Sequence, residues 1–181
     1  MYEELAEEYT RRILNLLGKI EDEKLKEGCI LFFSYYQDRF RKWPASIGHH
    51  GNQECGLIRH TAEVMKMALD ISSCVTYPVN QDYLIASAFL HDFGKLDDYE
   101  RNPEFPLTEW RYVTPRGPDH SLFPIINYPI VTGKALPKEV CNAILCHMGG
   151  WSKTSVFPET YLEGILCAAD LISTRTGSKM E

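Results

Sequence analysis

Apolar residues recur every three or four positions along most of the chain, the spacing that gathers them on one face of an α-helix. This pattern occurs twice before Pro44, with Asp22 between the two runs, and predicts a pair of amphipathic helices over residues 1–43. Because proline cannot continue a helix, Pro44 is expected to end the second of them.

Five further helical runs follow the polar, glycine-containing loop at residues 45–55. Asparagine and aspartate favour the position before a helix, and proline favours its first turn. On these signals the runs are Gly56–Cys74, one after Asn80, one from His120 behind Asp119, one at Pro137 and one at Pro158. The predicted fold class is all-α, a helical bundle of about seven helices.

The stretch at residues 96–118 interrupts the helical pattern. Its prolines and aromatic residues are Pro103, Pro106, Pro115, Pro118, Tyr99, Phe105, Trp110 and Tyr112. The stretch is too long for a simple connection, so we expect an irregular insertion or a short β-hairpin around residues 107–113. Two interpretations are open: a cover that packs its aromatic side chains on the helices, or a lid or stacking platform over a functional site.

The chain has 181 residues, 44% of them hydrophobic, without an internal repeat or a linker. It is predicted to be a single domain, residues 1–181, in which the helical pair at 1–43 packs on a core at 45–176. The net charge of −6 argues against a broad basic surface for long nucleic acids. Arg39, Arg41 and Lys42 form either a solvated helix end or a rim that faces phosphate.

The six cysteines show no C-x-x-C spacing and lie mostly in helical apolar patterns, so they are predicted to be reduced thiols of the core. The acidic start of the chain lacks the layout of a signal peptide, and no apolar run is long enough to cross a bilayer. We therefore expect a cytoplasmic protein without a membrane partner.

A histidine and an aspartate stand side by side in Leu90-His91-Asp92-Phe93-Gly94-Lys95, at the end of an apolar run. Helical spacing directs both side chains inward, and a buried carboxylate is costly unless a cation neutralises it. Gly94 is a natural helix stop, so both groups are expected at a helix end where a ligand can approach. A metal ion is the simplest partner that uses both groups at once.

Six polar residues share this setting, because each lies at a helix end or on an apolar face: His60, His91, Asp92, His120, His147 and Asp170. Taken singly, each histidine is more often a satisfied core residue than a ligand. Together they offer imidazole and carboxylate groups, which suit one or two ions of Mn, Fe, Co, Ni or Zn rather than calcium. The facing helices of a bundle can direct such ligands to one point.

The motif order of the chain resembles the HD-domain metal-dependent phosphohydrolase superfamily over about residues 45–176. The motifs are Gly56-Leu57-Ile58-Arg59-His60-Thr61-Ala62-Glu63-Val64, then Leu90-His91-Asp92-Phe93-Gly94-Lys95, then Ala169-Asp170. The resemblance implies that the first metal is bound by His60, His91, Asp92 and Asp170. It implies a second metal at His120 and His147, as in the two-metal members.

Within the superfamily, the chain is similar to the HD catalytic domain of bacterial 3′–5′ exoribonucleases that pair an OB-fold with an HD domain. The similarity rests on Pro44-Ala45, on His49-His50 before Gly56, and on Cys146-His147-Met148-Gly149. It implies hydrolysis of phosphoester bonds in nucleotides or at nucleic-acid ends. The acidic charge favours a nucleotide or a short single-stranded nucleic acid as the substrate.

Four residues are assigned roles beyond simple ligation. Asp92 is expected to bridge two ions and orient the attacking water, and Lys95 to reach a phosphate oxygen. Lys95 could instead be an exposed lysine that offsets the helix dipole. Arg175 is assigned to the substrate phosphate or to Asp170. His50 is either an ordinary loop histidine or a group that contacts the substrate or supports a metal ligand.

The alternative from a different functional class is a non-catalytic metal- or nucleotide-binding HD module that acts through a protein partner. The outer faces of the first two helices and the aromatic insertion would then be docking surfaces. The oligomeric state does not follow from the sequence.

Overall fold

The computed structural model describes residues 2–47, 53–105, 109–113, 119–151 and 156–176. Within them, the helices longer than one turn are α1 (Tyr2–Leu17), α2 (Glu23–Phe40), α3 (Gly56–Cys74), α4 (Gln81–Leu90), α6 (Leu122–Thr132), α7 (Lys138–Cys146) and α8 (Tyr161–Thr176). The short elements are α5 (Lys95–Asp98), β1 (Tyr99–Arg101), β2 (Trp110–Tyr112) and the 3-10 turn η1 (Gly149–Trp151). The all-α prediction is confirmed.

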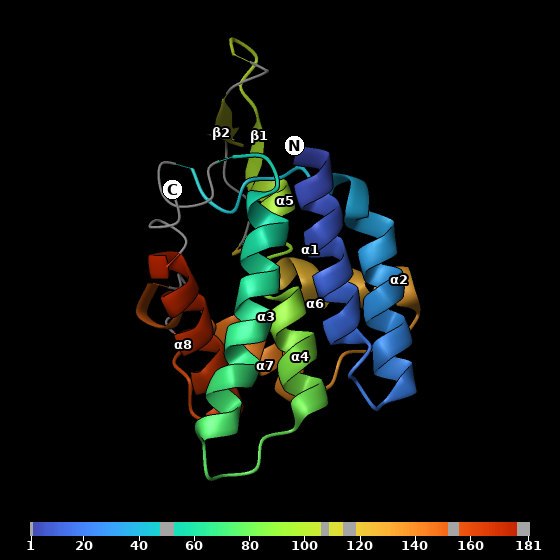
Figure 1. Cartoon of the computed structure of the whole chain (residues 1–181), viewed down its shortest axis with the longest axis vertical. Coiled ribbons are helices and arrows are strands. Elements are labelled where there is room, and N and C mark those ends of the chain that lie inside the picture. Colours follow the sequence, from blue (N-terminus) through green and yellow to red (C-terminus); the bar gives the residue numbers. More distant parts are fainter. Residues whose placement is uncertain (1, 48–52, 106–108, 114–118, 152–155, 177–181) are drawn as a thin grey trace.

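Helix α3 lies at the centre of the bundle and packs against α1, α4 and α8 (Figure 1). Helix α2 packs against α6, while α7 packs against both α4 and α8. The β1–β2 hairpin projects from the end of the bundle where α3 begins and α4 ends (Figure 1). Among the described residues, no helix combines the length and the apolar character that crossing a membrane requires.

An aromatic cluster anchors the turn that follows α4. The ring of Phe93 stacks on Phe40 of α2 with centroids 4.3 Å apart, and it also contacts Phe32 at 4.9 Å and Phe89 at 5.0 Å. All four side chains are buried. Because rings in such close contact resist displacement, the turn that carries His91 and Asp92 is fixed to the hydrophobic core.

Two helices begin with a side-chain cap, and the cap predicted at Asn80 is confirmed. The Asp22 carboxylate accepts from the backbone N–H groups of Lys24 and Leu25, both at the start of α2. The Asn80 side chain accepts from the N–H of Tyr83 in the first turn of α4. Such caps satisfy donors that have no partner inside the helix.

The prediction that Gly94 ends the fourth helix is wrong. Helix α4 ends at Leu90, and Gly94 adopts a right-handed conformation with φ −66° just before α5. Its lack of a side chain serves a different purpose, because an added Cβ would lie 2.6 Å from the backbone C and Cα atoms of His120. Glycine at this position lets two loops that are distant in sequence approach each other.

The helix predicted to begin at His120 begins two residues later, at Leu122. The Asp119 carboxylate accepts from the backbone N–H of Ser121 at 3.0 Å and from its hydroxyl at 2.6 Å, which forms a turn before the helix. His120 therefore lies in this turn rather than in the helix.

The insertion contains the predicted hairpin, but its first strand begins earlier than expected, at Tyr99. The two strands are antiparallel, with Tyr99 paired with Tyr112 and Arg101 with Trp110. Trp110 is buried between the ring of Trp43, 4.9 Å away, and the guanidinium of Arg101, 4.1 Å away. The base of the hairpin thus packs on Trp43 in the turn after α2, whereas Phe105, farther along the hairpin, is 52% exposed.

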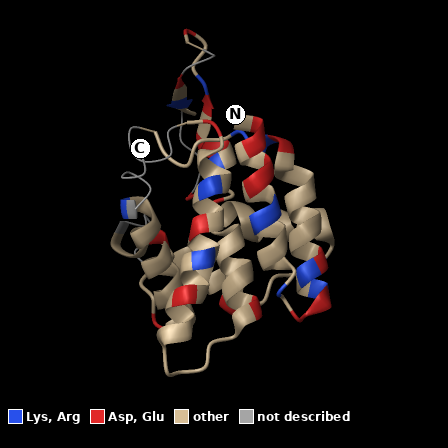
Figure 2. Cartoon of the chain, viewed as in Figure 1, with Lys and Arg blue, Asp and Glu red and all other residues tan. Residues whose placement is uncertain are grey.

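Basic and acidic residues are interspersed along the described part of the ribbon, where none of the helices or strands is basic along its whole length (Figure 2). Arg39 donates to the carbonyl of Leu96 and lies 3.3 Å from the Asp97 carboxylate, and Arg41 pairs with Glu3 at 2.6 Å. Both guanidinium groups therefore have acceptors within the protein. This favours the interpretation of a helix end bound to neighbouring residues over that of a rim that faces phosphate.

Candidate metal centre

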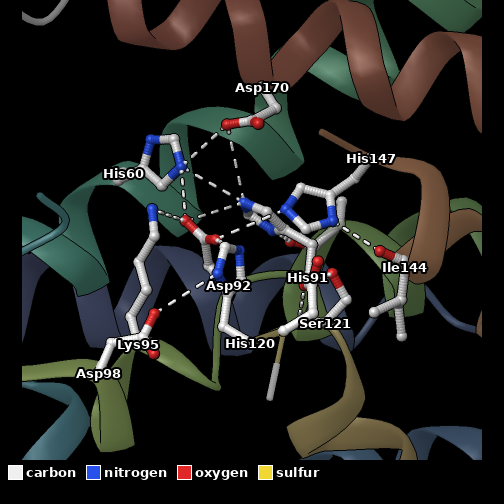
Figure 3. A network of polar contacts seen from close by, with 12 residues as sticks. His60, His91, Asp92, Lys95, Asp98, His120, Ser121, Ile144, His147 and Asp170 are labelled. Carbon is white, nitrogen blue, oxygen red and sulfur yellow. Dashed lines mark hydrogen bonds and ion pairs between the residues drawn. The ribbon is translucent and has the colours of Figure 1, made fainter. Parts of the chain in front are cut away.

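Six polar side chains converge at one end of the bundle (Figure 3). Most come from turns that follow or precede a helix, because a helix end lets a side chain point along the bundle rather than across it. Their positions are His60 in α3, His91 and Asp92 after α4, His120 before α6, His147 after α7 and Asp170 in α8. The structure brings together the six residues that the sequence singled out as metal ligands.

The first group of donor atoms belongs to His60, His91 and Asp170. One ligand atom from each lies within 4.8 Å of the other two. Nε2 of His60 is 3.1 Å from Oδ1 of Asp170 and 3.3 Å from Nε2 of His91. Both histidines are buried, so these groups face one another with little water between them.

The second group belongs to Asp92, His120 and His147, again with ligand atoms within 4.8 Å of one another. Oδ1 of Asp92 is 3.3 Å from Nε2 of His120 and 3.7 Å from Nε2 of His147. The other oxygen, Oδ2, turns to the first group and lies 3.1 Å from Nε2 of His60. The Asp92 carboxylate therefore stands between the two groups, with one oxygen toward each.

Backbone carbonyls fix the orientation of two of the imidazoles. Nδ1 of His91 lies 2.8 Å from the carbonyl of Ala88, and Nδ1 of His147 lies 2.6 Å from that of Ile144. A carbonyl can only accept, so Nδ1 carries the proton in each ring. In the neutral ring the lone pair is then on Nε2, which points into the centre as a metal ligand requires.

Side chains that the sequence analysis missed hold the other two imidazoles. The Ser173 hydroxyl donates to the carbonyl of Asp170 at 2.9 Å and accepts from Nδ1 of His60 at 3.1 Å. Nδ1 of His120 lies 3.5 Å from Oδ2 of Asp98. Ser173 could have been found from its position one helical turn after Asp170. Nothing in the sequence indicates a role for Asp98, because Asp97-Asp98 resembles an exposed pair of acidic residues.

The carboxylates raise the pKa of two histidines. Burial lowers the pKa of His60, but Asp170 and Asp92 outweigh it and raise the value to about 9. In the same way, Asp92 and Asp98 outweigh burial at His120 and raise its pKa to about 9. These sites therefore attract positive charge strongly, and protons and metal ions compete for the same lone pairs.

The donor set fits a divalent metal. Imidazole nitrogens and carboxylate oxygens are the ligands of first-row transition ions, and an outer polar contact faces each of the four rings. Nε2 of His120 is buried without a hydrogen-bond partner among the described residues, although it faces Asp92. A buried polar atom without a partner is costly, and a cation between the ring and the carboxylate would satisfy it.

The HD domain family matches residues 57–175, about two thirds of the chain and the whole span of this centre. The chain belongs to the HD domain family. No solved structure gives a significant match to it.

The chain is similar to a phosphodiesterase and to exoribonucleases of other organisms. A dihydroneopterin 2′,3′-cyclic phosphate phosphodiesterase from Methanocaldococcus jannaschii is 34% identical over 157 residues, covering 79% of this chain and 61% of the relative. The 3′-5′ exoribonuclease YhaM of Listeria welshimeri is 34% identical over 95 residues, covering 52% of this chain and 28% of the relative. YhaM of Oceanobacillus iheyensis is 30% identical over 97 residues, with coverages of 53% and 29%. The chain thus spans less than two thirds of each relative.

Lys95 of the HD motif lies at the centre rather than in solvent. Its Nζ is 2.6 Å from Oδ2 of Asp92, and its side chain is 16% exposed. Burial lowers the pKa of Lys95, but Asp92 and then Asp170 outweigh it, so the group stays an ammonium. For the Asp92 carboxyl, burial has the opposite effect and raises the pKa. Lys95 and the histidines outweigh burial and hold the pKa of Asp92 well below its usual range.

The structure does not test the roles predicted for two further residues, Arg175 and His50. Arg175 is exposed in the last turn of α8, two residues beyond Ser173. His50 lies outside the described residues, and both assignments stay predictions.

Proposed function

We propose that this chain is a metal-dependent phosphohydrolase that cleaves phosphodiester bonds in nucleotides or at the ends of short single-stranded nucleic acids. The observation that carries the proposal is the Asp92 carboxylate between two groups of metal donors, with one oxygen toward each. The names of the relatives support the bond type, because a cyclic phosphate phosphodiesterase and an exoribonuclease both act on phosphodiesters.

In this proposal His60, His91, Asp92 and Asp170 hold one ion. Asp92, His120 and His147 hold a second. Mn, Fe, Co, Ni and Zn are the ions that suit this mixture of ligands. When bound, the ions lower the pKa of water toward neutrality and offset the charge on phosphoryl oxygens.

The exposed edge of the centre sets the side from which substrate approaches. The side chains of Asp170, Lys95 and His120 are 18%, 16% and 13% exposed, whereas those of His91 and His147 are at most 1% exposed. We assign to this edge the phosphate of the substrate, with the Lys95 ammonium donating to a non-bridging oxygen. Asp92 orients the attacking water, and Arg175 and His50 are proposed as further substrate contacts.

The non-catalytic alternative explains fewer of these observations. A module that only senses a ligand needs one ion at most, whereas here two donor groups share one carboxylate.

A cytoplasmic location belongs to the proposal because all six cysteines are free thiols, as is usual in reducing compartments.

The test combines metal analysis with a substrate panel. The protein, stripped with EDTA and reloaded in separate samples with Mn, Fe, Co, Ni or Zn ions, is assayed on 2′,3′-cyclic nucleotides, 5′-mononucleotides, short single-stranded RNA and short single-stranded DNA. We expect release of phosphomonoester products from at least one phosphodiester, loss of turnover in EDTA and recovery on reloading. Metal and nucleotide binding without turnover under any of the five ions would favour the non-catalytic module instead.

A further inference from the structure

The outer nitrogens of the four imidazoles are held by partners of very different rigidity. Those of His91 and His147 bond to carbonyls one turn earlier in the chain, which move with the backbone. The outer nitrogen of His60, Nδ1, contacts the hydroxyl of Ser173. Ser173 is 1% exposed and is fixed by its own hydrogen bond to the α8 backbone. The outer nitrogen of His120 faces the carboxylate of Asp98, whose side chain is 21% exposed.

We propose that Asp98 is a positioning residue that sets the second metal position by holding His120; this inference rests on the proposed function. Figure 3 shows Asp98 on the outer side of the His120 ring, opposite Asp92. A carboxylate 3.5 Å from Nδ1 favours the proton on that nitrogen, which leaves the Nε2 lone pair for the ion. Asp98 faces Nδ1 of His120 rather than the donor atom Nε2, so it acts through the ring.

His120 depends on such a partner because its own backbone gives it little support. It lies in the turn before α6, not in a helix, and its ring is 13% exposed. A side chain in a turn has more freedom to rotate than one at a helix end, so an outer contact contributes more to its orientation.

Asp98 is well placed to provide this contact because its backbone is fixed on two sides. It is the last residue of α5, and its carbonyl accepts from the N–H of Val113 at 3.0 Å, just beyond β2. The hairpin thereby closes on the residue that orients His120. The two metal positions consequently differ: buried groups hold the ligands of the first, and a partly exposed carboxylate holds one ligand of the second.

The experiment measures how many ions bind and how tightly. The full chain, stripped with EDTA, is titrated with Mn²⁺ by calorimetry, and its metal content is measured by mass spectrometry. We expect two ions in the wild type. In Asp98→Ala and the isosteric Asp98→Asn, the first ion should bind as before and the second about 10–100-fold more weakly. Asp98→Glu, which restores a carboxylate, should recover part of the loss.

Asp97→Ala is the matched control. Asp97 is the neighbouring carboxylate, 62% exposed and paired with Arg39 on the surface, so its loss should leave both ions in place. Circular dichroism of each variant establishes that the helices are retained. Because metal stoichiometry is read directly, a general loss of stability does not imitate the expected result.

The outcomes separate this inference from the function on which it rests. Two ions bound equally tightly by Asp98→Asn and wild type would overturn the role of Asp98, as would equal weakening of both ions. A wild type that binds a single ion and still hydrolyses phosphodiesters would also overturn it, and would leave the proposed function intact. A wild type that takes up no ion would overturn the proposed function itself.

Discussion

Replacing Asp92 with asparagine is expected to remove both ions and to lower phosphodiester turnover by about 10³-fold, equivalent to about 4 kcal/mol of transition-state stabilisation. The side chain keeps its size but loses its charge, and an amide nitrogen replaces one oxygen. Because the two oxygens face different donor groups, one group loses its oxygen and the other keeps only a neutral amide oxygen in place of a carboxylate. Metal content by mass spectrometry and kcat/KM on the best substrate of the panel measure the effect.

Lys95 provides the contrast that separates metal binding from chemistry. Lys95→Met removes a cation but no metal donor, so we expect two ions to remain while turnover falls by about 10–100-fold.

The Asp92→Asn variant needs a control for lost stability, because it leaves the buried Lys95 ammonium beside a neutral group. The double variant Asp92→Asn, Lys95→Met provides this control. Full activity in Asp92→Asn, or metal content equal to that of the wild type, would contradict the proposed role of Asp92.

Gly94→Ala is expected to lower the free energy of unfolding by about 3 kcal/mol, because the new methyl group must displace backbone rather than a flexible side chain. The atoms in its way are the backbone C and Cα of His120, 2.6 Å from the added Cβ. A shift of either segment that relieves this contact changes the position of His120 relative to Asp92. The second ion should therefore be lost together with the stability, as urea unfolding and metal analysis can establish.

Gly164→Ala is the matched control for this substitution. Gly164 lies inside α8, and an added Cβ there would meet no atom within 4 Å. Because alanine favours a helix interior over glycine, the variant should gain about 0.5–1 kcal/mol and keep both ions. A Gly94→Ala protein as stable as the wild type would show that the loop holding His120 moves easily.

Local patterns predicted the helices well because apolar spacing and caps act within a few residues. Helix α3 has the predicted bounds, and Asn80 caps α4 as expected. The hairpin strands are three residues long, too short for an alternating pattern to mark where the first begins.

The features that escaped prediction depend on contacts between distant segments. The role of Gly94 follows from the approach of His120, 26 residues later, which no local signal records. Asp97 and Asp98 are identical in type and adjacent in sequence, yet one pairs with Arg39 on the surface and the other with His120. Only the fold distinguishes them.

The ring cluster around Phe93 means that the family match and the physical unit have different limits. The match starts at residue 57, but Phe32 and Phe40, which support Phe93, belong to α2. A fragment trimmed to residues 57–175 would expose one side of Phe93 to water. The loop bearing His91 and Asp92 would then lose the support of α2, so the physical unit that positions these two side chains includes α2 as well as the matched residues.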